Sequence, residues 1–472
     1  MWSLPWLLIS CSPTDTGFGT APGDSAVDSP TDSPVDTGPL PDLRGWAEPV
    51  GLPTLQGQPD VVWVTLDTLR ADMLGSGHTP GLAALFASGL TLTRHQASSN
   101  WTSPTMTAIL AGQDPLEVGY FPTRLSVVPD ALRLVGQVLG EQGYETWACT
   151  TNGVLGDAQL TRDYDHLGGW SEDARADEHV SWCLENTYAD LAQRTAPALI
   201  HTHFLDPHDA YRAPQELVEE VMLDLYGEVL EPLTLWGKTY ELDTDRGAYA
   251  ELELRWPEYD DDERTLLVRY LAAIYAAEVR FLDRELPALF DGLQALGVDL
   301  DQAVVMVATD HGEQLFERGH LTHARSAFAE ETAALAWLRA PGGPVGVYEG
   351  QTTHRDLASL LYGMLGVTED SASGLAALDG APRITTGFQC AQGEHISPLH
   401  AGQQAWALHS GGVRLVGDVD GTRRLYDARS DPGEAVDVYG TWDADPALLA
   451  ELEAAVDGVE AQALAGAQVC LE

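Results

Sequence analysis

The sequence predicts an α/β protein with one large, mostly parallel sheet and a small antiparallel sheet near the C-terminus. Short apolar, β-branched runs alternate along the chain with segments of helical spacing, as in strand–helix–strand units. Three of these runs end in acids or histidines, at the edge where parallel sheets bind ligands. After about residue 375 the pattern changes to short alternating segments separated by Gly and Asp, which is typical of antiparallel hairpins.

The expected elements follow one another along the chain. Buried strands are expected in four apolar runs, at 59–67, in the second half of 131–151, at 196–206 and at 302–313. Helices are expected at 79–90, in the first half of 131–151 and over the long amphipathic segment 263–297, which Pro287 could interrupt. The antiparallel segments lie within 403–434.

The charge of the chain limits its partners. Its 472 residues include 72 acidic and 25 basic ones, so that the net charge is −47. Such a surface repels nucleic acid and anionic lipid, and both are excluded as general partners. An anionic substrate would need local compensation, most simply from bound cations. The length indicates one large domain or two.

The N-terminus predicts an exported lipoprotein. An apolar run, Trp2 to Ser10, is too short to span a membrane and ends in Leu8-Ile9-Ser10-Cys11, which resembles a bacterial lipobox. Residues 12–45 are rich in Ser, Thr, Pro and Asp and are expected to form a disordered tether. The only expected membrane contact is a lipid on Cys11, which places the protein in the bacterial cell envelope, in the periplasm or at the cell surface.

Four further cysteines leave the disulfide pairing open. In an oxidising compartment Cys149, Cys183, Cys390 and Cys470 could form two bridges in three connectivities, and buried free thiols are an equal alternative. Their spacing is not that of a zinc site.

The polar strand ends predict a metal site. Asp67, Asp310 and His311 follow two predicted strands, and two carboxylates with an imidazole suit Zn²⁺ or Mn²⁺ better than Ca²⁺. Thr102 opens an expected helix, where free N–H groups favour anions. Its hydroxyl could be a fourth ligand and, bound to the metal, a nucleophile. Other histidines, among them His201, have no partner at ligand spacing, and ordinary core or surface roles are expected for them.

Five blocks of the chain resemble, in order, the motifs of the sulfatase branch of the alkaline phosphatase superfamily. They are VVWVTLDTLRADMLG (61–75), TPGLAALFASGLTLTRHQASSNWTSPTMTAILAGQDPLEVGY (79–120), HFLDPHDAYRAP (203–214), VVMVATDHGEQLFERGH (304–320) and LYDARSDPGEAVDVYG (425–440). The resemblance implies an alkaline-phosphatase-like fold, a large sheet flanked by helices. It also implies a catalytic domain at 46–375 and a C-terminal α+β subdomain at 376–472, after a signal segment at 1–11 and the tether. The implied activity is hydrolysis or transfer of sulfate or phosphate esters.

The resemblance assigns roles to residues by position. Asp67 corresponds to the first metal-binding acid of the family, Asp310 and His311 correspond to the late metal-binding pair, and Thr102 stands at the nucleophile position. The remaining candidates are substrate-side residues: His208 and His323 as catalytic histidines, and Asp206, Arg70 and His320 as further substrate contacts. For Arg70 a salt bridge elsewhere is an equal alternative, and Asp206 could be a ligand or could simply order His208.

The departures from the family pattern favour phosphate over sulfate esters. Sulfatases carry Cys or Ser in C/S-x-P-x-R for conversion to formylglycine, but Thr102 is not a substrate for that conversion and Met106 replaces the arginine. The sole lysine of the chain, Lys238, lies outside the motif blocks. We therefore expect a metal-dependent hydrolase without formylglycine, of the phosphodiesterase kind, acting on a small-molecule, glycan or lipid ester.

Two alternatives stay open at this level. One is a transferase that moves a phospho-substituent onto an envelope glycan or lipid with the same residues. The other is a catalytically inactive, surface-anchored binding protein, suggested by the loss of the arginine and of nearly all lysine. Retention of Asp67, Thr102, Asp310 and His311 argues against the second.

Overall fold

The computed structural model describes residues 47–471 except 121–125, 170, 172–173, 241, 244–245, 373, 382, 389–405, 419–420 and 432. The chain divides into residues 1–41 and a compact unit from Asp42 to Glu472, and all described residues belong to this second unit. The expected signal segment, with Cys11, and the tether lie outside the described residues. The boundary expected at 375 stays a prediction.

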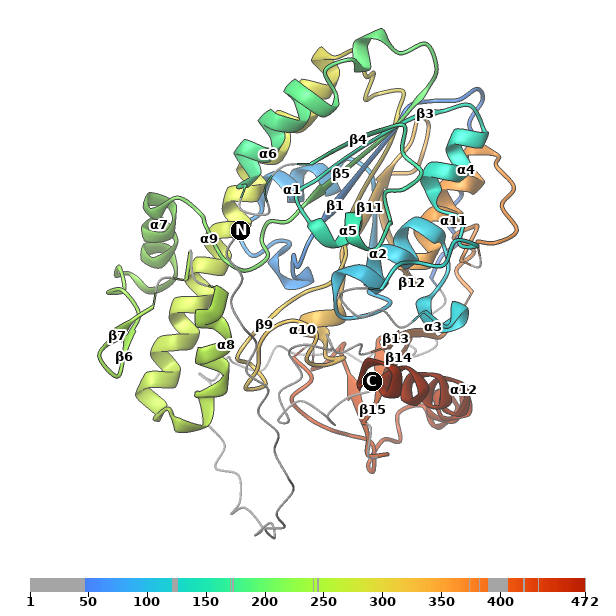
Figure 1. Ribbon diagram of the computed structural model, residues 1–472. Helices are drawn as coiled ribbons and strands as arrows, with labels where there is room; N and C mark the ends of the chain where they lie inside the picture. Colours follow the sequence, from blue (N-terminus) through green and yellow to red (C-terminus); the bar gives the residue numbers. More distant parts are fainter. Residues whose placement is uncertain are drawn as a thin grey trace. The chain divides into compact units, whose positions relative to one another are not determined.

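An eight-stranded sheet forms the centre of the described unit (Figure 1). From edge to edge its strands are β12 (Gly346–Thr353), β2 (Leu90–Gln96), β11 (Ala336–Arg339), β8 (Val304–Thr309), β1 (Val61–Leu66), β5 (Ala198–Phe204), β3 (Glu145–Thr150) and β4 (His166–Gly169). Only β11 runs antiparallel to its neighbours in this sheet; the other neighbouring pairs are parallel. The expected mostly parallel sheet is confirmed.

Strand β1 shows why the sheet is covered on both faces. Its six residues are all buried, and successive side chains point to opposite faces. Val62, Val64 and Leu66 join one apolar cluster with α6 (Ala176–Trp182), α7 (Gln215–Tyr226) and α9 (Asp261–Ala295). Val61 and Trp63 join another with α2 (Thr102–Ala111), α4 (Val135–Glu141) and α11 (His354–Leu365). Helices thus flank the sheet, as the family resemblance implied.

The remaining described elements of the sheet region are short. The helices are α1 (Pro80–Phe86), α3 (Pro115–Val118), α5 (Gly153–Asp157), α8 (Arg246–Leu254) and α10 (Ala329–Thr332), with helical turns at Ala71–Met73, Cys183–Thr187, Leu191–Gln193 and Trp256–Glu258. Two small hairpins are formed by β6 (Thr234–Leu235) with β7 (Lys238–Thr239) and by β9 (Gln314–Leu315) with β10 (Leu321–Thr322).

Pro287 does not interrupt the long helix α9, contrary to one expectation from the sequence. The helix runs through Pro287 without a break. Proline removes one backbone donor, but Leu286 and Leu289 on either side are buried in the core. Packing of this face therefore outweighs the lost hydrogen bond.

The small antiparallel sheet near the C-terminus is present as expected. Its order is β13 (Thr385–Phe388), β14 (Trp406–Ser410), β15 (Val413–Gly417) and β16 (Arg423–Asp427). Helix α12 (Pro446–Leu471) packs on it through Leu448, Leu452 and Val456, which form one apolar cluster with Trp406 and neighbouring strand residues.

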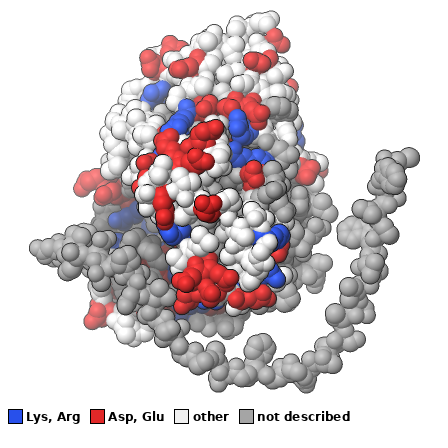
Figure 2. Space-filling view, turned by 90° about the vertical axis from the view of Figure 1, so that its left-hand side faces the viewer, with Lys and Arg blue, Asp and Glu red and all other residues white. Residues whose placement is uncertain are grey.

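On the side shown in Figure 2, acidic side chains (red) cover more of the described surface than basic ones (blue) do. This agrees with the net charge of −47. Among the described residues, no helix combines the length and the apolar composition that crossing a membrane requires.

Candidate active site

Two neighbouring parallel strands bring three of the expected residues together. β1 and β8 end side by side, since Leu66 pairs with Thr309 in their register. Asp67 follows β1, and Asp310 and His311 follow β8. Their ligand atoms all lie within 4.8 Å of one another, and all three side chains are buried. The structure thus brings these three residues close together, and their role as metal ligands stays a prediction.

The next residue, Gly312, lets the backbone pass close to a neighbouring segment directly after His311. A Cβ atom at this position would lie 2.1 Å from the backbone oxygen of Glu330, which no side chain permits. The N–H of Gly312 also donates to the backbone oxygen of Glu331 at 2.8 Å. Directly after His311 the backbone therefore runs so close to Glu330 and Glu331 that only glycine fits at position 312.

The hydrogen bonds of this group leave three atoms facing one another. Oδ1 of Asp310 accepts from the backbone N–H groups of Thr68 (3.0 Å) and His311 (2.7 Å), and Nδ1 of His311 donates to the backbone oxygen of Gly312 (2.9 Å). Nε2 of His311 is then an acceptor, 3.7 Å from Oδ1 of Asp67 and 3.5 Å from Oδ2 of Asp310.

These two carboxylate oxygens are buried and have no hydrogen-bond partner. Three acceptor atoms that face one another without a donor are unfavourable in a dry protein interior, because nothing offsets their charge. A divalent cation would satisfy all three at once. The residues present therefore fit a metal ion, and an oxygen–oxygen–nitrogen donor set suits Zn²⁺ or Mn²⁺.

The charges of the group lead to the same conclusion. Burial raises the pKa of Asp67, but the hydrogen bond from His203 and the nearby His208 and His311 outweigh it and lower this pKa to about 2. Burial and the charge of Asp67 raise the pKa of Asp310 well above its usual range. Burial lowers the pKa of His311 to about 4. One carboxylate is thus ionised at the expense of the other, a conflict that a bound cation would remove.

Thr102 lies beside this group at the first position of α2. Its Oγ1 is 3.4 Å from Oδ2 of Asp67 and 3.5 Å from Nε2 of His311. No side chain caps the start of this helix, so the Thr102 hydroxyl has no capping role. The Thr105 hydroxyl donates to the backbone oxygens of Trp101 and Thr102. Helix α2 therefore presents its N-terminal end and the Thr102 hydroxyl to the cluster of Asp67, Asp310 and His311, which is called the acidic group below.

Three histidine rings connect the acidic group to the substrate-side candidates. The ring centroids of His311 and His323 are 4.6 Å apart, and those of His323 and His208 are 4.8 Å apart. Burial lowers the pKa of His208, but Asp209, 2.8 Å from its Nδ1, outweighs this with other nearby acids and raises it to about 10. Burial lowers the pKa of His323 well below its usual range. His208 is therefore a cation and His323 a neutral ring at neutral pH.

The other substrate-side candidates have structural partners. Asp206 accepts a hydrogen bond from the N–H of Ala176 at 3.2 Å and bonds to the carboxyl group of Glu278, and burial raises its pKa. Nδ1 of His320 is 3.2 Å from Oε1 of Glu253. Neither contact is with the acidic group.

Arg70 is likewise occupied elsewhere. Its guanidinium binds Asp72 at 2.7 Å, Glu317, and the backbone oxygen of Glu313 at 3.0 Å. The structure thus favours the salt-bridge role that the sequence left open for this residue. A supply of positive charge to the substrate by Arg70 stays a prediction.

Two residues beside Asp67 were not predicted from the sequence. Nδ2 of Asn152 donates to Oδ2 of Asp67 at 2.6 Å, and Nε2 of His203 lies 3.3 Å from the same oxygen. Asn152 follows β3, so its position after an apolar strand was a usable signal. His203 lies inside β5 with its side chain on one face of the strand, and no pattern in a single sequence distinguishes it from a packing histidine.

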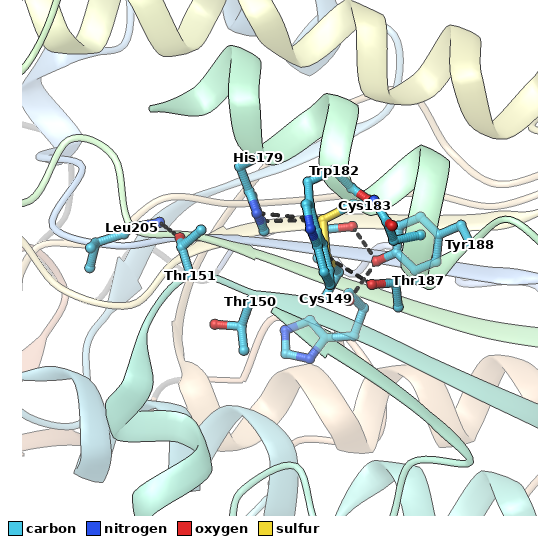
Figure 3. The surroundings of a disulfide bond; sticks show 12 residues. Cys149, Thr150, Thr151, His179, Trp182, Cys183, Thr187, Tyr188 and Leu205 are labelled. Carbon is cyan, nitrogen blue, oxygen red and sulfur yellow. Dashed lines mark hydrogen bonds between the residues drawn. A yellow bond between two sulfur atoms is a disulfide. The ribbon is translucent and has the colours of Figure 1, made fainter. Parts of the chain in front are cut away.

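A disulfide bond joins β3, the strand that precedes Asn152, to the helical segment after α6 (Figure 3). Cys149 in β3 is bonded to Cys183, next to the end of α6. Thr151, two residues beyond Cys149, accepts a hydrogen bond from the N–H of Leu205 at 3.2 Å. One of the pairings left open by the sequence is thereby settled, whereas Cys390 and the side chain of Cys470 lie outside the described part of the chain.

Comparison with known proteins decides the family. The family model described as Sulfatase matches residues 59–367, which include every residue of the acidic group. The chain belongs to the sulfatase family. The expected membership in the alkaline phosphatase superfamily is confirmed, and with it an ester hydrolase.

Relatives of this sulfatase-family chain are distant. A choline-sulfatase of Rhizobium meliloti (strain 1021) is 23% identical over 365 residues, which are 66% of this chain and 68% of the relative. A solved structure in complex with its substrate D-glucosamine-2-N,6-O-disulfate has a TM-score of 0.67 at 15% identity, covering 86% of this chain and 98% of that one. The phosphonate monoester hydrolase of Agrobacterium radiobacter has a TM-score of 0.62 at 17% identity, covering 86% and 96%. The structural likenesses establish the fold that these proteins share.

Proposed function

We propose that this sulfatase-family hydrolase cleaves phosphate esters, in preference to sulfate esters, with Thr102 as its nucleophile. The observation that carries the proposal is the position of the Thr102 hydroxyl, 3.4 Å from Asp67 and 3.5 Å from His311. This is where a nucleophile is activated in a hydrolase that uses a metal ion.

Asp67, Asp310 and His311 would hold the metal ion, with Zn²⁺ or Mn²⁺ favoured and Ca²⁺ possible. The fit rests on the two unpartnered carboxylate oxygens and the acceptor nitrogen described above. When bound, such an ion lowers the pKa of a neighbouring hydroxyl and offsets negative charge on the transferred group.

The chain's own residues account for the remaining steps. Oγ1 of Thr102 attacks phosphorus in line as the bond to the leaving oxygen breaks, which leaves a phosphothreonine. The N-terminal end of α2, the cationic His208 and the adjacent ring of His323 stabilise the negative charge of the phosphoryl group. His208 gives a proton to the leaving oxygen, and the hydroxyl proton of Thr102 passes to solvent. Water then attacks the phosphothreonine: the now neutral His208 takes a proton from this water, phosphate leaves, and the Thr102 oxygen regains its proton from solvent.

The surroundings of Thr102 favour phosphate over sulfate. Met106, at the position of the family's motif arginine, is fully buried in the apolar cluster of α2. Lys238 binds Glu251 in the small β6–β7 hairpin region. Neither residue offers the positive charge with which the family recognises a sulfate group, and the hydroxyl of Thr102 needs no conversion to act on a phosphate ester.

A comparison of matched esters tests the proposal. The full chain and its Thr102→Ala and Ser103→Ala variants would be assayed with Zn²⁺, Mn²⁺ or Ca²⁺ on nitrophenyl phosphate, bis-nitrophenyl phosphate and nitrophenyl sulfate. We expect phosphoester turnover that falls at least about 10³-fold in Thr102→Ala and changes little in Ser103→Ala, whose hydroxyl contacts Tyr120 instead. Sulfate turnover that survives in Thr102→Ala would show that another residue is the nucleophile. Absence of any turnover in metal-bound protein would favour an inactive binding protein.

We also propose that the protein is exported and anchored through a lipid on Cys11. The lipobox-like segment supports this, and so does the Cys149–Cys183 disulfide, because such bonds persist in oxidising compartments. In a bacterial host the full chain is expected in the membrane fraction, and Cys11→Ala is expected to move it to the soluble fraction. Recovery of both forms in the soluble fraction would exclude the anchor.

A further inference from the structure

A row of polar side chains, all buried except the half-buried Tyr164, connects Asp67 to the segment that precedes the edge strand β4. Oδ2 of Asp67 lies 3.3 Å from Nε2 of His203, and Nδ1 of the same ring lies 2.8 Å from Oγ1 of Thr65. The Thr65 oxygen also lies 3.0 Å from Nε2 of His201, whose Nδ1 is 3.2 Å from Oη of Tyr164. Four contacts thus join five side chains in series.

The two central strands fix this arrangement. Thr65 of β1 stands opposite His203 of β5 in their parallel register. His201 and His203 are two residues apart on one strand and therefore point to the same face. On the opposite face Thr202 contacts Oη of Tyr188 at 2.9 Å and takes no part in the row. Because strands hold side chains more rigidly than loops do, the contacts form a defined path.

One set of hydrogen positions satisfies all four contacts. The carboxylate of Asp67 can only accept, so Nε2 of His203 donates to it, and Nδ1 of the same ring is left to accept from a hydroxyl. The Thr65 hydroxyl must then donate to this Nδ1, and its oxygen accepts from Nε2 of His201. Burial lowers the pKa of His201 to about 3, so that this ring is neutral and its Nδ1 accepts from Tyr164. Every donor in the row points toward Asp67.

We propose that Tyr164, His201, Thr65 and His203 form a hydrogen-bond chain that positions Asp67, holding its Oδ2 so that Oδ1 faces the metal site. This inference rests on the proposed function, since it takes Asp67 as a metal ligand. None of the four residues touches the acidic group except through Asp67, so they are positioning residues. Partners of this kind commonly change the metal affinity of a site by 10–100-fold.

Metal affinity measured without turnover tests the chain. Full-length protein would be stripped with a chelator and titrated with Zn²⁺ or Mn²⁺ by isothermal titration calorimetry. Thr65→Val keeps the shape of the side chain but removes both of its contacts, and we expect the dissociation constant to rise about 10-fold or more. Thr65→Ser restores the hydroxyl and should recover affinity to within about 3-fold. Thr202→Val is the matched control on the other face of the sheet, and its affinity should equal that of the wild type.

The far end of the chain gives the decisive comparison. Tyr164→Phe removes the hydroxyl at the far end of the hydrogen-bond chain, where three side chains separate it from Asp67. We expect a smaller but measurable loss of metal affinity. In the Thr65→Val background the same change should have no further effect, because the path is already interrupted. Tyr226→Phe is its control, because this hydroxyl donates to the backbone oxygen of Arg269 and contacts no member of the hydrogen-bond chain. Wild-type affinity in Tyr164→Phe, or losses that add in the double variant, would overturn the inference.

Two further outcomes separate this inference from the proposed function. Long-range nitrogen–proton NMR spectra of ¹⁵N-histidine-labelled protein should show Nε2–H tautomers for His201 and His203; an Nδ1–H form of either would overturn the chain alone. A wild-type protein that hydrolyses phosphoesters and binds metal, with all variants unchanged, would also overturn the chain alone. A wild-type protein that binds neither metal ion would overturn the proposed metal site and the chain with it.

Discussion

The side-chain amide of Asn152 donates a hydrogen bond of 2.6 Å to Oδ2 of Asp67, while its Oδ1 accepts from the N–H of Val154 at 2.9 Å. The second bond caps helix α5 and fixes which end of the amide faces Asp67. The orientation of Asp67, a ligand of the proposed metal site, therefore depends on a helix cap three residues beyond Cys149.

Substitution of Asn152 should weaken metal binding without unfolding the protein. Asn152→Ser keeps a good capping residue but is too short to reach Asp67, and we expect the dissociation constant for Zn²⁺ or Mn²⁺ to rise about 10-fold. Asn186→Ala removes an exposed amide bonded to the backbone oxygen of Trp182 and serves as the control. Equal metal affinity in Asn152→Ser and the wild type, measured by calorimetry, would count against a role for this hydrogen bond.

Removal of the disulfide should lower stability substantially. Cys149 and Cys183 are 34 residues apart, and closing a loop of this length in the unfolded chain corresponds to about 4 kcal/mol. We expect the double variant Cys149→Ala/Cys183→Ala to lose free energy of unfolding of this order in urea titrations. Reductant should lower the stability of the wild type toward that of the variant and leave the variant unchanged. If reductant destabilised both equally, the bond would not be the cause.

Asp283 of α9 should stabilise the start of α1. Its carboxylate accepts from the N–H groups of Gly81 (2.8 Å) and Leu82 (2.6 Å), which the helix itself leaves unpaired. We expect Asp283→Ala to cost about 1–3 kcal/mol of unfolding free energy, since both donors lose a charged partner. Asp291→Ala, at an exposed position of the same helix, should change stability by less than about 0.5 kcal/mol. Similar losses in the two variants would contradict the capping role.

Asp114 should make stability depend on pH between about 4 and 6. Burial raises the pKa of this carboxyl group from 3.8 to about 6, although Arg355 and a 2.6 Å hydrogen bond from Ser98 oppose the rise. The folded protein therefore binds the proton more tightly than the unfolded chain does. The resulting stability is present below pH 3.8 and is lost as pH rises through 6, by roughly 3 kcal/mol in total.

Asp114→Asn provides the check, because its neutral amide cannot titrate. The difference in unfolding free energy between wild type and variant, measured in urea at several pH values, should move in favour of the variant as pH rises from about 4 to 7. A difference that is constant across this range would show that Asp114 titrates normally.

The sequence predicted the sheet because apolar β-branched runs of this length have few alternatives. It also predicted that Asp67, Asp310 and His311 would meet, since the carboxyl ends of parallel strands share one edge of a sheet. Thr102 was predicted from its place at the start of a helix together with the family pattern, and the structure brings its hydroxyl within 3.5 Å of His311. In each case the decisive information is local: where an element begins or ends.

The hydrogen-bond and salt-bridge partners of the site residues could not be predicted from the sequence in the same way. Whether Arg70 binds substrate or Asp72, and whether His201 packs or joins a hydrogen-bond chain, depends on strand order and register. These are set by the burial of apolar faces on both sides of the sheet, which is a property of the whole core. The sequence by itself therefore determined the fold class and the residues at the strand ends. Only the tertiary structure decided which donor each acceptor meets, because hydrogen bonds are short-ranged and join residues that lie as far apart in the chain as Thr65 and His203.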